Sequence, residues 1–71
     1  MSTAPRIVSQ FAKRVRELRL KRDISQERLG EMAGLHRTYI GMIERAEKNI
    51  TLVNLEKVAR ALGVKPSSLI D

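Results

Sequence analysis

The amino-acid sequence predicts an all-α fold, a compact single domain of five helices. Three observations support this prediction. Apolar residues recur at helical spacing in two stretches, two shorter helical patterns meet at Gly34, and Gly63 follows the last strongly periodic stretch. With 71 residues, the chain has room for one domain only.

The first helix is predicted from a stripe of apolar residues on one side. The stripe consists of Ile7, Phe11, Val15 and Leu18, at positions i, i+4, i+8 and i+11. Pro5 suits the start of a helix, so residues 1–6 are expected to form a flexible arm. The helix is expected to end near residues 21–23.

Residues 25–45 predict two short helices joined by a sharp turn. The Ser25 hydroxyl can cap the first of them by accepting a backbone N–H. Gly30 costs about 1 kcal/mol relative to alanine inside a helix, which predicts close approach by the next helix. Gly34 tolerates the left-handed conformation that a tight helix end needs.

The second short helix has two different faces. Ile40 and Ile43 are apolar, and Tyr39 beside them is expected to bury its ring in part and to expose its hydroxyl. The opposite face shows Arg37, Thr38, Gly41, Met42 and Arg45. A two-helix unit with a short glycine turn and such a second helix is the helix-turn-helix arrangement, which places that helix in the DNA major groove.

Residues 51–71 predict two further helices and a dimer interface. A core face is formed by Leu52, Leu55, Val58, Ala59 and Leu62, with Thr51 as a cap and Gly63 at the end. Residues 67–70 form a short last helix after Pro66. These helices contain more aliphatic residues than their own packing needs, namely Val53, Leu69 and Ile70. We expect these three residues to form a two-fold dimer patch; the alternative is that they are scattered exposed aliphatic residues.

Composition limits the function. The net charge is +6, and residues 1–24 hold seven basic against two acidic side chains, which suits a polyanion partner or simply a soluble basic surface. With no cysteine and one histidine, no disulfide, zinc site or other cofactor is expected. No apolar run approaches the roughly 20 residues of a membrane span, so a cytoplasmic protein without membrane contact is expected.

Within residues 25–45, the spacing of small and apolar residues resembles the helix-turn-helix family. Gln26 opens the unit, Gly30 and Gly34 stand at its small positions, and the core positions are Leu29, Ala33, Leu35, Ile40 and Ile43. Residues 7–70 as a whole resemble phage-repressor-type (Xre, or lambda-repressor-like) DNA-binding domains. Residues 36–64 are similar to the controller proteins of restriction-modification systems.

The resemblance implies base contacts from the helix that begins at Arg37. The planar guanidinium of Arg37 would donate two hydrogen bonds, one to O6 and one to N7 of a guanine. Thr38 could contact a phosphate or a thymine methyl. Met42 replaces a commoner glutamine and either contacts a thymine methyl or packs inward. Gly41 would permit closer backbone approach and leave some specificity to DNA shape.

Phosphate contacts and one ion pair are also implied. The phosphate contacts are assigned to Ser25, Gln26, His36, Tyr39, Arg45, Lys48 and Asn49. For Arg45, Lys48 and Asn49, which follow the helix that begins at Arg37, the alternative is a solvated turn. For His36 the alternative is a surface histidine without a role in binding. Arg19 and Glu44 are expected to form a structural, bidentate ion pair.

These features predict a homodimeric, sequence-specific transcriptional regulator of double-stranded DNA. Its pseudo-palindromic operator would have half-sites about 34 Å apart. The preferred subtype is the autoregulatory controller of a restriction-modification operon; a prophage repressor, an antitoxin-like regulator and, from another class, a helical protein-interaction module are the alternatives. No enzyme is expected. Activation by contact with RNA polymerase and repression by blocking it are both open.

Overall fold

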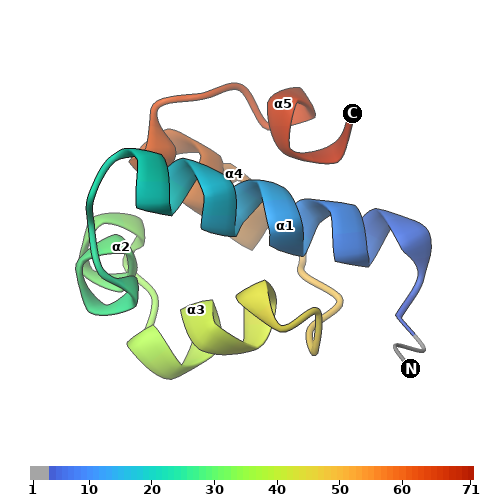
Figure 1. Ribbon diagram of the computed structural model, residues 1–71, viewed down its shortest axis with the longest axis horizontal. Helices are drawn as coiled ribbons and strands as arrows, with labels where there is room; N and C mark the ends of the chain where they lie inside the picture. The colour runs from blue at the N-terminus through green and yellow to red at the C-terminus, as the bar shows by residue number, and fades with distance from the viewer. Residues whose placement is uncertain (1–3) are drawn as a thin grey trace.

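The computed structural model describes residues 4–71, and they form five α-helices. Their bounds are α1 (Arg6–Lys21), α2 (Gln26–Ala33), α3 (Arg37–Glu44), α4 (Leu52–Leu62) and α5 (Ser67–Ile70). Figure 1 shows α1 across the middle of the molecule, α4 behind it, α5 above it and α3 along the lower edge. The described part measures 29 × 23 × 22 Å. The all-α fold and the five helices are confirmed.

Helix α1 begins at Arg6, the last residue of the predicted flexible arm. Pro5 precedes the helix, and its carbonyl accepts the N–H groups of Val8 and Ser9. Arg6 is therefore helical and does not belong to an arm. The rest of that prediction falls partly on residues 1–3, which lie outside the described residues.

Helices α2 and α4 begin and end as their sequences predict. Ser25 accepts the Arg28 N–H, and Thr51 accepts the Asn54 N–H, so each hydroxyl caps a helix. At the other ends, Gly34 has a φ of 70° and Gly63 a φ of 71°, the left-handed conformation that glycine tolerates best. Local chemistry therefore fixes the ends of these two helices.

One hydrophobic core joins all five helices. Its buried members are Phe11, Val15, Leu29, Ile40, Ile43, Leu55, Val58, Ala59, Leu62 and Leu69. Two predicted core residues are wrong: Ile7 is exposed, and Leu52 is 82% exposed. Both lie in the first turn of a helix, where helical periodicity gives the direction of a side chain but not whether a neighbouring helix covers it.

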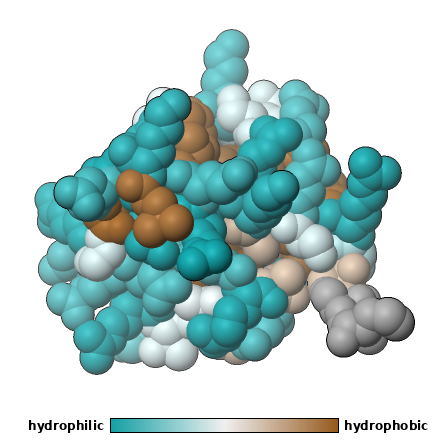
Figure 2. All heavy atoms as spheres, viewed as in Figure 1, coloured by the Kyte–Doolittle hydropathy of each residue, from teal (hydrophilic) through white to brown (hydrophobic). Residues whose placement is uncertain are grey.

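The predicted dimer patch needs one correction. Leu69 is 0% exposed and belongs to the core, because α5 packs against α1 and its single turn directs this side chain inward. Val53 and Ile70 are exposed, as predicted. Figure 2 shows that hydrophilic residues cover most of the face seen in Figure 1, with hydrophobic residues in separate small patches. No helix within residues 4–71 is long and apolar enough to cross a membrane.

Candidate nucleic-acid interface

The turn between α2 and α3 depends on Gly30. The Gly30 carbonyl accepts the Leu35 N–H at 2.8 Å, so the chain folds directly back over this residue. A Cβ atom at position 30 would lie 2.5 Å from the Leu35 carbonyl oxygen and 3.3 Å from the Arg37 nitrogen. The predicted close approach is confirmed, and the group that approaches is the backbone leading into α3.

Helix α3 has one side free of the rest of the molecule. It packs against α2 and α1, and in Figure 1 no helix lies beneath it. Arg37 and Thr38 are exposed in its first turn, and Met42 is half-buried one turn later. Two of the three side chains that were predicted to contact bases are therefore exposed, and the third, Met42, is partly covered.

Gly41 does not leave the open gap that its sequence position suggested. It is buried, and a Cβ atom there would lie 3.0 Å from Arg45 Nη1 and 3.5 Å from Gln26 Oε1. The missing side chain thus makes room for two polar side chains of the protein. Contact between the Gly41 backbone and DNA would require those side chains to move.

The predicted ion pair between Arg19 and Glu44 is bidentate. Arg19 Nε donates to Glu44 Oε2 at 2.7 Å and Nη2 donates to Oε1 at 3.0 Å, and the Glu44 side chain is only 3% exposed. Arg19 Nη1 also donates to the Ile24 carbonyl at 2.9 Å. The pair therefore joins α1 to the end of α3, and Arg19 also binds the segment that precedes α2.

The hydrogen bonds to Glu44 raise the pKa of the Arg19 guanidinium; burial of the side chain opposes this, and the negative charge of Glu44 adds to it. A raised pKa in the folded state stabilises the protonated form. The contribution of the protonated Arg19 to stability is therefore present at neutral pH. It is lost only as the pH rises through the pKa of the guanidinium, far into the alkaline range.

Gln26 takes part in the same network, which the sequence interpretation missed. Its Nε2 donates to Glu44 Oε1 at 3.1 Å. A phosphate contact from Gln26, as predicted, would have to use the second N–H of this amide. Ser25 similarly accepts the Arg28 N–H with its oxygen and retains its O–H as a donor.

His36 and Tyr39 also make contacts within the protein. His36 Nδ1 accepts the Thr38 N–H at 3.0 Å, so this residue caps α3 and keeps its Nε2–H as a donor. Tyr39 is half-buried, but its hydroxyl accepts a hydrogen bond from Asn54 Nδ2 at 3.1 Å. The prediction of a hydroxyl exposed to solvent missed this partner. Lys48 Nζ lies 6.0 Å from the centre of the Tyr39 ring.

Three arginines around α2 and α3 are each paired with a carboxylate. Arg37 contacts Glu27 at 2.6 Å, Arg45 contacts Glu47 at 3.0 Å, and Arg28 contacts Glu31 at 3.6 Å. The last pair has the spacing i, i+3 on one helix and can be recognised in the sequence. The pair of Arg37 with Glu27 joins two helices, and the sequence interpretation missed it.

The other predicted phosphate residues follow α3. Lys48 is half-buried and Asn49 is exposed in the segment between α3 and α4. With Arg45 they place polar donors beyond the end of α3. The predicted DNA residues thus lie on α3, in the segments that flank it and at the start of α2, whereas the Arg19 and Glu44 side chains are largely buried.

Comparison with known proteins adds an independent finding. A family model described as Helix-turn-helix matches residues 15–69. Control protein C.BamHI from Bacillus amyloliquefaciens is 50% identical over 62 residues, which are 86% of this chain and 76% of that protein.

Two solved structures have the same fold. The restriction-modification controller protein C.AhdI from Aeromonas hydrophila has a TM-score of 0.84 and 44% identity, covering 87% of this chain and 94% of that one. The controller protein C.Esp1396I, solved as a tetramer in complex with its natural 35 base-pair operator, has a TM-score of 0.85 and 31% identity, covering 92% and 86%. The chain therefore belongs to the helix-turn-helix family, and within it is similar to the controller proteins of restriction-modification systems.

Proposed function

We propose that this protein is a sequence-specific regulator of transcription that places α3 in the major groove of double-stranded DNA. The observation that carries the proposal is the free side of α3, with Arg37 exposed in the first turn. Residues near the N-terminus of a recognition helix are those that contact base edges, and an arginine there can donate two hydrogen bonds to guanine. Thr38 and Met42 would contact the neighbouring bases.

Donors on both sides of α3 would contact the phosphates. Ser25 O–H and the second N–H of Gln26 lie at the start of α2, where the helix dipole favours an anion. His36 Nε2–H and the Tyr39 O–H remain available as donors, because their hydrogen bonds within the protein use acceptor atoms. Arg45, Lys48 and Asn49 would contact phosphates beyond the other end of α3. Such contacts fix the position of the protein without selecting a sequence.

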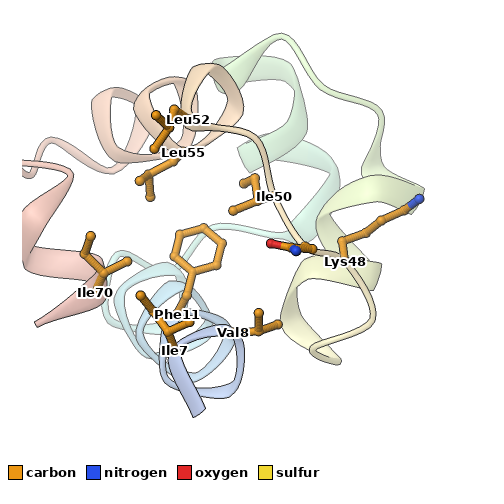
Figure 3. Close-up of a pocket in the computed structure, with 9 residues that line it drawn as sticks. Ile7, Val8, Phe11, Lys48, Ile50, Leu52, Leu55 and Ile70 are labelled. Atoms are coloured by element: carbon orange, nitrogen blue, oxygen red, sulfur yellow. The ribbon is translucent and has the colours of Figure 1, made fainter. Parts of the chain in front are cut away.

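The protein would bind as a homodimer through a groove between α1, α4 and α5. We define this apolar groove by six of its apolar lining residues, Ile7, Phe11, Ile50, Leu52, Leu55 and Ile70; Val8, Lys48 and Asn49 complete the lining. Figure 3 shows side chains from all three helices and from the segment before α4 around one space. Val53 follows Leu52 in the chain and is also exposed. A second copy bound two-fold symmetrically would cover these side chains and give the small domain more buried apolar surface.

The dimer is tested with a pair of leucine variants. Leu52→Glu places a charge in the apolar groove, and Leu20→Glu places the same charge on an exposed leucine of α1 that does not line it. Sedimentation equilibrium should show a dimer for the wild type and for Leu20→Glu, and a weakening of association of about tenfold or more for Leu52→Glu. Equal association of the two variants would contradict this interface.

The subtype that we propose is the controller of a restriction-modification operon, acting on its own promoter. The support is the similarity to C.BamHI and C.AhdI, because each match covers most of this chain. The controller protein C.Esp1396I was solved as a tetramer in complex with its natural 35 base-pair operator, which supports operator binding by more than one copy of the chain.

The experiment is binding to the DNA upstream of the protein's own gene. Fluorescence anisotropy should show preference for this duplex over one of scrambled sequence. Arg37→Ala should lower the affinity for the upstream duplex by about 5- to 150-fold, whereas Arg60→Ala, an exposed arginine of α4, should have little effect. Equal affinity for the upstream and scrambled duplexes would exclude autoregulation through this segment.

A further inference from the structure

The contact between Arg37 and Glu27 connects the predicted base-reading arginine to a carboxylate of another helix. Arg37 Nη1 donates to Glu27 Oε2 at 2.6 Å. Glu27 lies in the first turn of α2, and Arg37 is the first residue of α3. The contact therefore spans the turn of the helix-turn-helix unit and fixes the direction of the Arg37 side chain relative to both helices.

Stability alone does not account for this pair. Its side chains are 64% and 61% exposed, and ion pairs so close to solvent contribute little to folding. Glu27 also lies at the positive end of the α2 dipole, where a carboxylate is favourable. That role requires no contact with Arg37, so the two roles predict different effects of substitution.

The contact with Glu27 leaves two N–H donors of Arg37 free to contact a base. Within residues 4–71, the only partner of its guanidinium is Glu27, and that contact uses Nη1. The Nε–H and one N–H of Nη2 form the opposite edge of the planar fork. These two donors are sufficient for the bidentate contact with O6 and N7 of guanine.

We propose that Glu27 is a positioning residue that sets the base specificity of Arg37, an inference that rests on the proposed function. The carboxylate holds the guanidinium by Nη1 and presents the Nε–Nη2 edge to the floor of the major groove. Without this contact, the long side chain can turn to the nearest phosphate, which attracts it at any sequence. A fixed arginine distinguishes guanine from other bases, whereas a free one increases affinity for all DNA.

The negative charge of Glu27 has a separate effect on affinity. It reduces the positive potential at the start of α3 and so weakens the sequence-independent attraction to phosphate. This attraction is the same for duplexes that differ at one base pair, so the charge alone lowers both affinities and leaves their ratio unchanged. The ratio therefore reports how Glu27 positions Arg37.

The test compares Glu27→Ala with Glu31→Ala. Both substitutions remove one carboxylate from an exposed position of α2, and Glu31 is 62% exposed and paired with Arg28 instead of Arg37. The operator is first defined by selecting bound sequences from a random duplex pool with the wild-type protein. Anisotropy then gives the affinity of each variant for the operator and for a duplex changed at the base pair that depends on Arg37.

Both variants should bind the changed duplex more tightly, because each loses a negative charge. Only Glu27→Ala should lower the ratio between operator and changed duplex, by roughly fivefold, the lower end of the discrimination that one bidentate arginine–guanine contact provides. In an Arg37→Ala background, Glu27→Ala should no longer change this ratio.

An unchanged ratio in Glu27→Ala, or an equal fall in Glu31→Ala, would overturn the assignment and leave the proposed function intact. A wild-type protein that selects no sequence would overturn both, so the two failures are distinguishable. A thermal unfolding midpoint that falls in Glu27→Ala without any change in the ratio would assign Glu27 to the α2 dipole alone.

Discussion

Replacing Glu44 by alanine should strongly destabilise the domain, although the residue lies at the end of a short helix. Its carboxylate accepts two hydrogen bonds from Arg19 and one from Gln26, and the side chain is 3% exposed. Glu44→Ala leaves the Arg19 guanidinium partly buried, with the Ile24 carbonyl as its remaining partner. Loss of one member of a buried pair costs about 3 kcal/mol or more, because the other charge stays unpaired.

This loss is large for a chain of this size. A domain of 71 residues is expected to be stable by about 4–10 kcal/mol. One kcal/mol corresponds to about 4–8 °C in the unfolding midpoint of such a domain, so Glu44→Ala should lower the midpoint by about 12 °C or more. Circular dichroism at 222 nm, where α-helices give a strong negative band, is a suitable signal because residues 4–71 form five helices.

Glu47→Ala is the matched control, because Glu47 pairs with Arg45 at 3.0 Å on the exposed surface. It should cost at most about 1 kcal/mol. The double variant Arg19→Met with Glu44→Leu should recover most of the lost stability, because it removes both charges from the buried position. If Glu44→Ala and Glu47→Ala unfold at the same temperature, the ion pair does not hold α1 to α3 and the reasoning is refuted.

Two further predictions concern the backbone. Gly30→Ala should destabilise the domain by about 1–3 kcal/mol in urea unfolding, because the new Cβ would lie 2.5 Å from the Leu35 carbonyl oxygen; no loss would show that the turn can widen freely. Ala46→Gly should stabilise it by up to about 1 kcal/mol, because Ala46 has a φ of 59°; Ala61→Gly inside α4 is the control and should cost about 1 kcal/mol.

Helix existence and helix ends were predictable because they depend on neighbours in sequence. Ser25 and Thr51 cap the helices that follow them, and Gly34 and Gly63 end them in the left-handed conformation. The positions of Leu52 and Leu69 were not predictable in this way. Helical periodicity gives the direction of a side chain, whereas burial depends on which other helix lies opposite. The spacing of residues within one helix does not reveal how the helices pack against one another.

In the candidate site, too, some residues were assigned from the sequence, whereas contacts between helices were missed. Arg37 was assigned from its place at the start of a helix, and the Arg19 pair with Glu44 was assigned from the family resemblance; the structure confirms the pair. The contacts of Arg37 with Glu27 and of Gln26 with Glu44 were missed. Each joins residues of two helices whose relative orientation is set by the turn at Gly34, and no spacing rule within one helix reveals them.

The central claim is that Arg37 on α3 selects a base within a two-fold symmetric DNA site. Selection from a random duplex pool with the purified wild-type protein and with Arg37→Ala, at two salt concentrations, tests it most directly. The account predicts a palindromic consensus for the wild type that loses definition at one base pair in each half-site in the variant. A pool that stays random while DNA is retained only at low salt would contradict it, because binding would then come from the basic surface alone.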